Sequence, residues 1–455
     1  MIALTAMSAS AYDFVKNGIY YNIIGNGRAE VTYKSFSNPG YSGNVTIPLS
    51  VNYDSRKYNV MRIGDYAFRN CNVNVTYDYG LNISSIGQYA FFNVTFTGDF
   101  ALPAGLQKVE KGAFAYSNIK GTLSVSEGGL EEIGDSAFAR CQQLSELKFT
   151  DRLKRIGDYA FCGCNYIKQI NLGGAIEYIG DDAFLSAGSP SSVSLGNSIK
   201  HIGKEAFRDV SLTSVTIPAS VEYIGSCAFG YPYLYYVNYA SNLPFERGVS
   251  LKTVTINSAK FMDSNPRIVE IFGCDVKNYV LGEGVTKIPD NAFSPVNLEG
   301  GMSAESKLES IVLPSSLISI GEQAFNSCLY LQNFDFASDQ INLKRIERLA
   351  FFNTGLMNIT IPEGIEEVGS GAFQKASIPK VIFDKSNLVL PTNCFTGNST
   401  TDVFITSKDK YAYYHKMFKN VYVVGDASSP EEDVNHDGQV NSLDVLKVYK
   451  YMQTH

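Results

Sequence analysis

A six-residue motif, Ile-Gly-x-x-Ala-Phe, recurs along most of the chain and constrains its fold more than any other feature. Its thirteen copies, the last of them degenerate, begin at Ile63, Ile86, Val109, Ile133, Ile156, Ile179, Ile202, Ile224, Ile288, Ile320, Ile346, Val368 and Leu390. From Phe68 to Phe229 the closing phenylalanines are 22 to 24 residues apart. A catalytic loop has no chemical reason to occur so often. The motif is therefore architectural, and a fixed period of this length is typical of a solenoid.

A second pattern, an alternation of apolar and polar residues, lies between successive motifs. Examples are LSELKF from Leu144, LTSVTI from Leu212 and LMNITI from Leu356. A period of two predicts a short strand whose apolar side chains all point to one side. A proline such as Pro218 or Pro362 often ends the strand, because it cannot donate a hydrogen bond to a sheet.

The motif predicts the inside of each coil of the solenoid. We expect Ile and Phe to point inward, Ala to let the turn approach the strands, and the two variable residues to face water on a short helical turn. Gly is expected to allow a backbone conformation at the corner that a β-carbon would oppose. One coil cannot cover its own apolar face, so neighbouring coils stack and their phenylalanines form a spine.

The patterns divide the chain into five predicted parts. Ala9-Ser10-Ala11 has the small-x-small form of a signal-peptide cleavage site, and strands with Gly and Asn turns precede the first motif. The predicted parts are a signal-peptide remnant at 1–11, an N-terminal β cap at 12–60, a solenoid of about 15 coils at 61–424 that is irregular at 230–290, a linker at 425–432, and a separate segment at 433–455.

The repeated motif, strands such as LTSVTIP from Leu212, and the opening DFVKNGIYYNI, AEVTYKS and YSGNVTIP resemble the BspA-like leucine-rich repeat family over about residues 12–425. The resemblance implies an α/β repeat solenoid: a right-handed superhelix with a parallel sheet on one face and short helical or 3-10 turns on the other. Members of this family are largely secreted or surface-attached proteins of anaerobic bacteria and of some protists. Their implied role is protein binding or adhesion, including to host extracellular proteins.

Eight cysteines in an exported chain invite a disulfide framework, but the repeat offers another explanation. The third position after the motif Phe is a slot for small residues, occupied by Cys71, Val94, Ser117, Cys141, Cys164, Ala187, Val210, Cys328, Thr354 and Ala376. Cys394 takes the Ala position of its motif. We expect these five cysteines to be buried free thiols. A disulfide between Cys141 and Cys164 stays open, because adjacent coils bring their backbones close but align their side chains in parallel.

No group of residues predicts catalysis, so we expect that the protein is not an enzyme. The chain has four histidines, His201, His415, His436 and His455, and none lies in a nucleophile motif. Asp65, Asp135 and Asp158 share one motif position and are expected to favour the start of the turn. A net charge of -7 argues against nucleic acid. No apolar run reaches the roughly 18 residues that a membrane span needs.

One segment with metal-binding chemistry follows the solenoid. Positions 1, 3, 5, 7 and 12 of a loop, with Gly438 at position 6, hold Asp433, Asn435, Asp437, Gln439 and Asp444. Alternate oxygen ligands, a glycine at the sharp turn and a closing carboxylate predict a Ca2+ site; the alternative is a polar surface turn. The final Asp, in place of the Glu of an EF-hand, makes the loop resemble a dockerin repeat. Cellulosomal dockerins carry two such halves and only one is visible, which leaves a cohesin-like partner in doubt.

The segment YPYLYYVNY offers candidate ligand-binding residues on the solenoid. Tyr231, Tyr233, Tyr235 and Tyr236 are predicted to be exposed on one coil. Tyrosines on a rigid surface add contact area at low entropic cost and are enriched at binding hot spots. The alternative is that tyrosine, with 29 copies, is simply common here and covers an irregular coil.

These observations favour a secreted or cell-surface solenoid that binds extracellular protein or glycan ligands and carries a calcium-stabilised docking segment. We expect a monomer that neither binds nucleic acid nor spans a membrane. The alternative is a scaffold: the solenoid is a spacer that recognises nothing, and the dockerin-like tail attaches it to a larger surface assembly.

Overall fold

The structure of the protein is a computed structural model. It describes residues 11–103, 105–124, 129–190, 192–230, 251–297, 303–334, 342–362, 364–376, 378–383, 388–398, 401–405 and 408–423. The chain divides into two compact units, the first comprising residues 1–230 with 238–251 and the second residues 231–237 with 252–455. The predicted calcium loop at 433–444 and the tyrosines at 231–236 lie outside the described residues.

In unit 1 each coil contributes one two-residue strand to a parallel sheet, which we call the motif-side sheet. Each strand consists of the first motif residue and the residue before it, and the strands pair in chain order. They are β8 (Ser85–Ile86), β10 (Lys108–Val109), β12 (Glu132–Ile133), β14 (Arg155–Ile156), β16 (Tyr178–Ile179), β18 (His201–Ile202) and β20 (Tyr223–Ile224). Ile156 lies beside Ile133 on one side and Ile179 on the other, so the inward residues form one apolar row.

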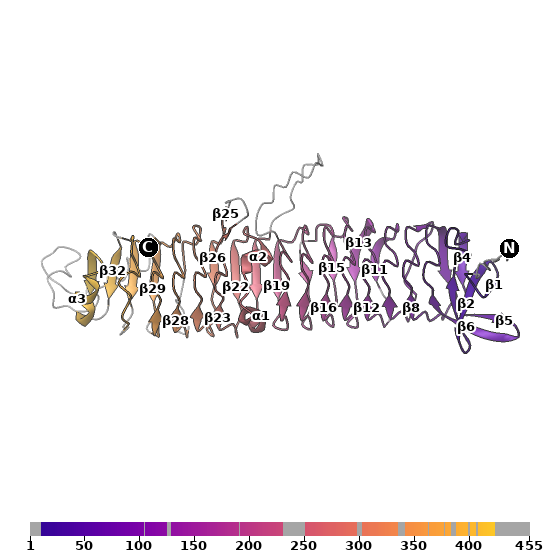
Figure 1. Cartoon of the computed structure of the whole chain (residues 1–455), viewed down its shortest axis with the longest axis horizontal. Helices are drawn as coiled ribbons and strands as arrows, with labels where there is room; N and C mark the ends of the chain where they lie inside the picture. The colour runs from indigo at the N-terminus through magenta and orange to yellow at the C-terminus, as the bar shows by residue number, and fades with distance from the viewer. Residues whose placement is uncertain are drawn as a thin grey trace, which may run out of the picture. The chain divides into compact units, whose positions relative to one another are not determined.

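A second set of strands comes from the alternating segments between motifs, and Figure 1 shows it on the opposite side of unit 1. Its members are β4 (Ser42–Ile47), β7 (Asn72–Tyr77), β9 (Thr95–Phe96), β11 (Lys120–Ser124), β13 (Gln143–Lys148), β15 (Gln169–Asn171), β17 (Val193–Ser194) and β19 (Ser214–Ile217). The strands predicted from the period-two pattern, such as β13 and β19, are therefore confirmed. The motif-side sheet, on the face where helical turns were predicted, was not expected. Two-residue strands are too short for a period-two pattern to be recognised in a sequence.

The motif folds into a tight turn, and the predicted helical or 3-10 turn is wrong here. In the first coil the N–H group of Ala67 donates to Gly64 of its own coil, whereas that of Phe68 donates to Ala90 of the next coil. Tyr66 is left-handed, with a φ of 58°. A left-handed residue cannot continue a helix, and the same alternation of donors recurs in later coils. Hydrogen bonds within a coil therefore alternate with hydrogen bonds between coils.

The motif glycine is required by the neighbouring coil. A Cβ atom on Gly157 would lie 2.6 Å from the backbone nitrogen of Asp135 and 2.8 Å from the carbonyl carbon of Gly134. These distances are shorter than van der Waals contact, and the φ of Gly157 is outside the left-handed region. Close approach of the coils, and not the expected corner conformation, explains this glycine.

The predicted phenylalanine spine is confirmed in unit 1. Ring centroids of successive motif phenylalanines from Phe68 to Phe229 are 4.9 to 5.3 Å apart, with interplanar angles of 2 to 8°. The motif alanines of these coils, such as Ala160, are fully buried. Burial of one large aromatic ring per coil supplies much of the stability of the stack.

Strands at the N-terminal end of unit 1 extend the motif-side sheet. β1 (Phe14–Lys16), β2 (Ile19–Gly25) and β3 (Arg28–Thr32) are antiparallel neighbours, β3 pairs in parallel with β6 (Arg56–Ile63), and β5 (Ser50–Tyr53) forms a hairpin with β6. Tyr41 is buried, and its ring centroid lies 4.5 Å from that of Phe68. An aromatic ring thus precedes the first phenylalanine of the spine.

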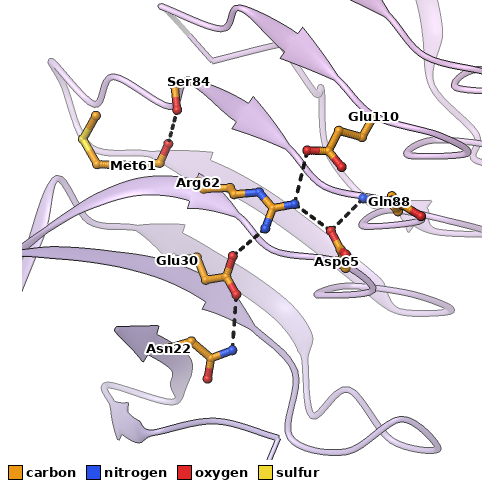
Figure 2. A network of polar contacts seen from close by, with 8 residues as sticks. All are labelled: Asn22, Glu30, Met61, Arg62, Asp65, Ser84, Gln88 and Glu110. Carbon is orange, nitrogen blue, oxygen red and sulfur yellow. Dashed lines mark hydrogen bonds and ion pairs between the residues drawn. The ribbon is translucent and has the colours of Figure 1, made fainter. Parts of the chain in front are cut away.

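A charge cluster links these N-terminal strands to the first coils (Figure 2). The Arg62 guanidinium donates to Glu30 on β3 at 2.8 Å, to Asp65 at 2.7 Å and to Glu110 at 3.2 Å. The side chains of Arg62 and Glu30 are only 26% and 12% exposed. Partial exclusion of water strengthens such pairs relative to exposed ones. The cluster therefore holds three levels of the unit together.

Unit 2 has the same two-sided coil. Its motif-side strands are β23 (Lys287–Ile288), β27 (Ser319–Ile320), β28 (Arg345–Ile346) and β30 (Glu367–Val368), and its other parallel strands are β21 (Thr253–Ile256), β22 (Asn278–Leu281), β26 (Ser310–Val312), β29 (Asn358–Ile361), β31 (Lys380–Phe383), β32 (Asp402–Ile405) and β33 (Asn420–Val423). Motif rings from Phe293 to Phe395 are 4.9 to 5.4 Å apart. The spine is thus confirmed in this unit as well.

Some segments of unit 2 depart from this coil. The helices α1 (Ala259–Asp263) and α2 (Ile268–Phe272) lie between the motif copies at Ile224 and Ile288, within the stretch that the sequence predicts to be irregular. Asn265 between them accepts the N–H of Asp290 at 3.0 Å through its Oδ1 atom. A short antiparallel pair and a terminal helical segment complete the unit: β24 (Val296–Asn297), β25 (Ser303–Ala304), η1 (Lys408–Lys410) and α3 (Tyr411–Tyr414).

Two further features bear on the fold predictions. No helix within the described ranges is long and apolar enough to cross a membrane. The strands of both units are mainly parallel and the helices few and short, as expected for a leucine-rich repeat. The right-handed sense of the superhelix stays a prediction.

Candidate functional surface

The small-residue slot after each motif Phe is confirmed as a buried position. Cys71, Cys141, Cys164, Cys328 and Cys394 are buried free thiols, so Cys141 and Cys164 form no disulfide. The Cys141 Sγ atom donates to the carbonyl of Phe114 at 3.1 Å, one coil earlier. Burial raises the pKa of the Cys141 thiol to about 12. A protonated, buried thiol is a poor nucleophile, which makes these cysteines structural.

The aspartates at the third motif position bind the backbone of the next coil. The Oδ1 atom of Asp65 accepts the N–H of Gln88 at 3.0 Å, that of Asp135 accepts the N–H of Asp158 at 3.1 Å, and that of Asp158 accepts the N–H of Asp181 at 3.0 Å. Their role is structural, as expected, but the partner is the neighbouring coil instead of the start of their own turn.

On the motif-side sheet, the residue before the motif Ile or Val faces outward, and these residues form a column across the coils. In the early coils of unit 1 their charges are paired: Lys108 lies 3.0 Å from Glu132. The adjacent column is paired as well, with Lys154 3.5 Å from Glu131. Exposed pairs of this kind contribute little to stability, and they leave few unpaired charges on this part of the sheet.

In the next four coils the outward positions of this column hold planar side chains. We call these four residues the ring ladder: Arg155, Tyr178, His201 and Tyr223. The Arg155 guanidinium lies 3.9 Å from the Tyr178 ring centroid. The Tyr178 and His201 rings stack at 4.6 Å and 8°, and the His201 and Tyr223 rings at 4.7 Å and 16°. Parallel strands separated by about 4.8 Å place side chains of one column in face-to-face contact, so the sheet itself fixes this stack.

The polar atoms of the ring ladder are not used in hydrogen bonds within the described part of the chain. Within the described residues, the side chains of Arg155, Tyr178, His201 and Tyr223 make no hydrogen bond and no ion pair. Tyr223 is 51% exposed, and the other three are exposed in part. The ladder therefore presents unused hydrogen-bonding groups on a rigid sheet.

Carboxylates lie close to the middle of the ring ladder. Burial, the largest influence, lowers the pKa of His201, the charges of Asp181 and Asp158 oppose this shift, and the positive charge of Arg155 reinforces it. The net lowering of the pKa keeps the imidazole neutral near pH 7. A neutral imidazole has one N–H donor and one acceptor nitrogen.

Sequence reasoning misses the ring ladder. The signal that could find it is the two-residue sequence of each motif-side strand, which reads Arg-Ile, Tyr-Ile, His-Ile and Tyr-Ile in four consecutive copies.

On the other set of strands, the residues that alternate with the buried apolar ones are exposed, as Gln169, Ser214 and Thr216 are. Among the described residues, no three or more His, Cys, Asp or Glu side chains form a group that could hold a metal ion.

Comparisons with known proteins agree with this architecture. The family model described as BspA type leucine-rich repeat region matches residues 50–126, 122–235 and 301–423, together more than half of the chain. A leucine-rich repeat protein from Bacteroides ovatus is 23% identical, with 87% of this chain and all of that chain covered, at a TM-score of 0.50. At this identity the likeness supports the fold alone.

Two other solved structures are more distant. A leucine-rich cell surface protein from Faecalibacterium prausnitzii is 21% identical over 90% of this chain and 97% of that chain, at a TM-score of 0.36. The pneumococcal vaccine antigen PcpA is 15% identical over 91% of this chain and 98% of that chain, also at 0.36. A search of curated proteins found no significant match.

Proposed function

Since the chain belongs to the BspA-type leucine-rich repeat family, we propose that it is a secreted or cell-surface protein whose solenoid binds extracellular protein or glycan ligands. The proposed role is recognition and not catalysis. We further propose that the chain acts as a monomer and that residues 433–455 form a calcium-binding docking segment.

The observation that carries the proposal is the contrast between the inward and outward residues of the coils. In four successive coils the inward strand residue is isoleucine, at Ile156, Ile179, Ile202 and Ile224, and all four are buried. The outward residue beside it changes from Arg to Tyr to His to Tyr. The core specifies the coil, so the outward side chains are available for recognition without disturbing the fold.

The docking segment rests on the spacing of oxygen-bearing side chains in the tail. Asp433, Asn435, Asp437 and Asp444, with the carbonyl of Gln439, would supply the oxygen ligands that Ca2+ prefers. Calcium is abundant outside cells, which agrees with the proposed location.

Deleting residues 426–455 tests which part recognises a ligand. The full chain and the deletion variant are compared for binding to immobilised extracellular-matrix proteins and mucin, with melting curves to confirm folding. We expect binding to survive the deletion. Loss of all binding to these surfaces in the truncated chain would favour the spacer alternative, in which the tail alone makes the attachment.

Calorimetry on the full chain tests the calcium loop. One Ca2+ per chain is expected, with a dissociation constant between about 10⁻⁷ and 10⁻³ M. Asp433→Ala should abolish this heat, and Asp426→Ala in the linker should leave it unchanged. Equal calcium binding by the chain and its Asp433→Ala variant would rule the site out.

A further inference from the structure

We propose that the ring ladder of Arg155, Tyr178, His201 and Tyr223 is a binding site for a neutral, hydroxyl-rich glycan. This inference rests on the proposed function, because it assigns the solenoid's recognition surface and chooses its ligand class. Three properties of the ladder lead to it: unused donors, neighbouring acceptors, and ring faces that are already covered.

The first property is a row of hydrogen-bond donors at coil spacing. The guanidinium of Arg155 has five N–H groups, and each tyrosine has one hydroxyl. Within the described residues no protein group accepts from these side chains. The Arg155 guanidinium lies over the Tyr178 ring, with its Cζ atom 3.9 Å from the ring centroid, and a guanidinium presents its N–H groups in a fixed planar fork. These donors are therefore held in place before any ligand arrives.

The second property is a parallel row of acceptors. The Oδ1 atoms of Asp158 and Asp181 accept backbone N–H groups of the next coil, at 3.0 and 2.7 Å. Their Oδ2 atoms accept no hydrogen bond from the part of the chain that the structure describes. Both carboxylates lie close enough to His201 to influence its charge. A sugar hydroxyl both donates and accepts, so donors and acceptors side by side suit adjacent hydroxyls of one sugar ring.

The third property distinguishes a glycan from a protein partner. Tyr178 and His201 stack face to face with their neighbours, which leaves mainly ring edges, hydroxyls and nitrogens exposed. Protein hot spots depend on burying aromatic faces in apolar pockets, and these faces are already used within the stack. What remains is a polar ridge, which a polyhydroxylated ligand can match.

The local charge favours a neutral glycan over an acidic one. The positive charge of Arg155 is accompanied by the negative charges of Asp158 and Asp181, and nearby Lys200 is paired with Glu177 at 3.7 Å. An acidic polysaccharide would bring its carboxylates against the two aspartates. A neutral one meets no such repulsion and gains charge-assisted hydrogen bonds to Arg155 and the carboxylates.

Native affinity electrophoresis of the full chain tests the proposal. Gels contain one neutral polysaccharide each (amylopectin, mannan, galactomannan or xyloglucan), and a further gel contains polygalacturonate. Retardation by at least one neutral polysaccharide is expected. Arg155→Met should weaken that binding about tenfold or more, and Tyr178→Phe, which keeps the stack and removes one hydroxyl, should weaken it less.

The matched control is Arg345→Met, because residues 343–346 repeat the Leu-Lys-Arg-Ile of residues 153–156 without a neighbouring ring. It should leave binding unchanged. Retardation by none of the neutral polysaccharides, retardation by polygalacturonate alone, or an equal loss with Arg155→Met and Arg345→Met would each overturn the inference. Binding to matrix proteins or mucin by the tail-deleted chain, with no polysaccharide retarding it, would overturn the inference and leave the proposed function standing.

Discussion

The tetrapeptide Leu-Lys-Arg-Ile occurs in unit 1 at residues 153–156 and in unit 2 at residues 343–346. In unit 1, the strand that holds Arg155 lies between those of Glu132 and Tyr178. Glu132 is engaged by a lysine of the preceding coil, and the guanidinium of Arg155 lies on the Tyr178 ring instead. The arginine becomes the first group of the ring ladder.

In unit 2 the same four residues have other neighbours. The strand of Arg345 lies between those of Ser319 and Glu367, and the Arg345 Nε atom approaches Glu347 at 3.8 Å. No ring stacks on this arginine among the described residues of its neighbouring strands. The comparison teaches that a coil's own sequence determines its fold, whereas the adjacent coils determine the chemistry of its surface.

The interior should behave alike in the two units, and this is the largest expected effect. Phe161 and Phe351 are fully buried members of the two spines. Replacing either by Ala should lower the free energy of unfolding by about 3–5 kcal/mol, because a cavity is left in a stack of rings. Urea denaturation measures this, with Tyr166→Ala, at a 65% exposed ring, as the control expected to change stability by less than about 0.5 kcal/mol. A near-neutral result at Phe351 alone would break the equivalence.

Arginines on the motif-side sheet should differ according to their neighbours. Arg62→Met removes the cation that holds three carboxylates and should lower the unfolding free energy by about 1–3 kcal/mol, less than for a fully buried pair. Arg345→Met removes one exposed contact and should change it by less than about 0.5 kcal/mol. Equal losses in thermal or urea unfolding would contradict the argument from neighbouring coils.

Two buried tyrosines sharpen the comparison at a smaller scale. The hydroxyl of Tyr41 in unit 1 donates to the Thr32 carbonyl and accepts the N–H of Tyr20, whereas the buried hydroxyl of Tyr279 in unit 2 has no partner among the described residues. Tyr41→Phe should destabilise by about 1 kcal/mol, and Tyr279→Phe should stabilise by a similar amount. Melting temperatures of the two variants should therefore shift in opposite directions.

The smallest effect is the contribution of the ring ladder of unit 1 to the pH dependence of stability. The pKa of His201 is lowered by burial, so the unfolded chain binds this proton more readily than the folded chain. The associated stability is fully present above the ordinary histidine pKa of about 6.5. It is lost as the pH falls through the lowered folded-state pKa. His201→Gln should remove this part of the pH dependence, as measured by urea unfolding at pH 7.5 and pH 5. If the unfolding free energy of the His201→Gln variant depends on pH in the same way as that of the parent chain, His201 does not contribute to this dependence.

The sequence predicted what depends on one coil alone. The Phe spine, the buried alanines and the cysteines in the small-residue slot all follow from inward positions that recur at a fixed period. Those side chains have the same surroundings in every coil. The period therefore predicts that Cys141 and Cys164 are buried, whereas the question of a disulfide between them depended on the adjacent coils and is answered by the structure, where both are free thiols.

What the sequence could not predict depends on register between coils. The ring ladder requires that residues 22 or 23 positions apart, such as Tyr178 and His201, lie directly beside each other. The reason for Gly157 is likewise the backbone of the preceding coil. Two-residue strands carry too little pattern to reveal that register. The calcium loop and the tyrosines at 231–236 lie outside the described residues and stay predictions.

The alternating hydrogen bonds of the motif turn have a mechanical consequence. Phe68 donates to the next coil and Ala67 to its own, so the bonds between coils point along the direction in which the coils stack. Tension applied in that direction within a unit would load the bonds of every level equally, together with those of the parallel strands. The levels would give way one after another, and each coil would keep its own internal bonds until then. The chain should then lengthen in steps of one period, 22 to 24 residues, which is how a tether absorbs a sudden pull without losing its whole fold.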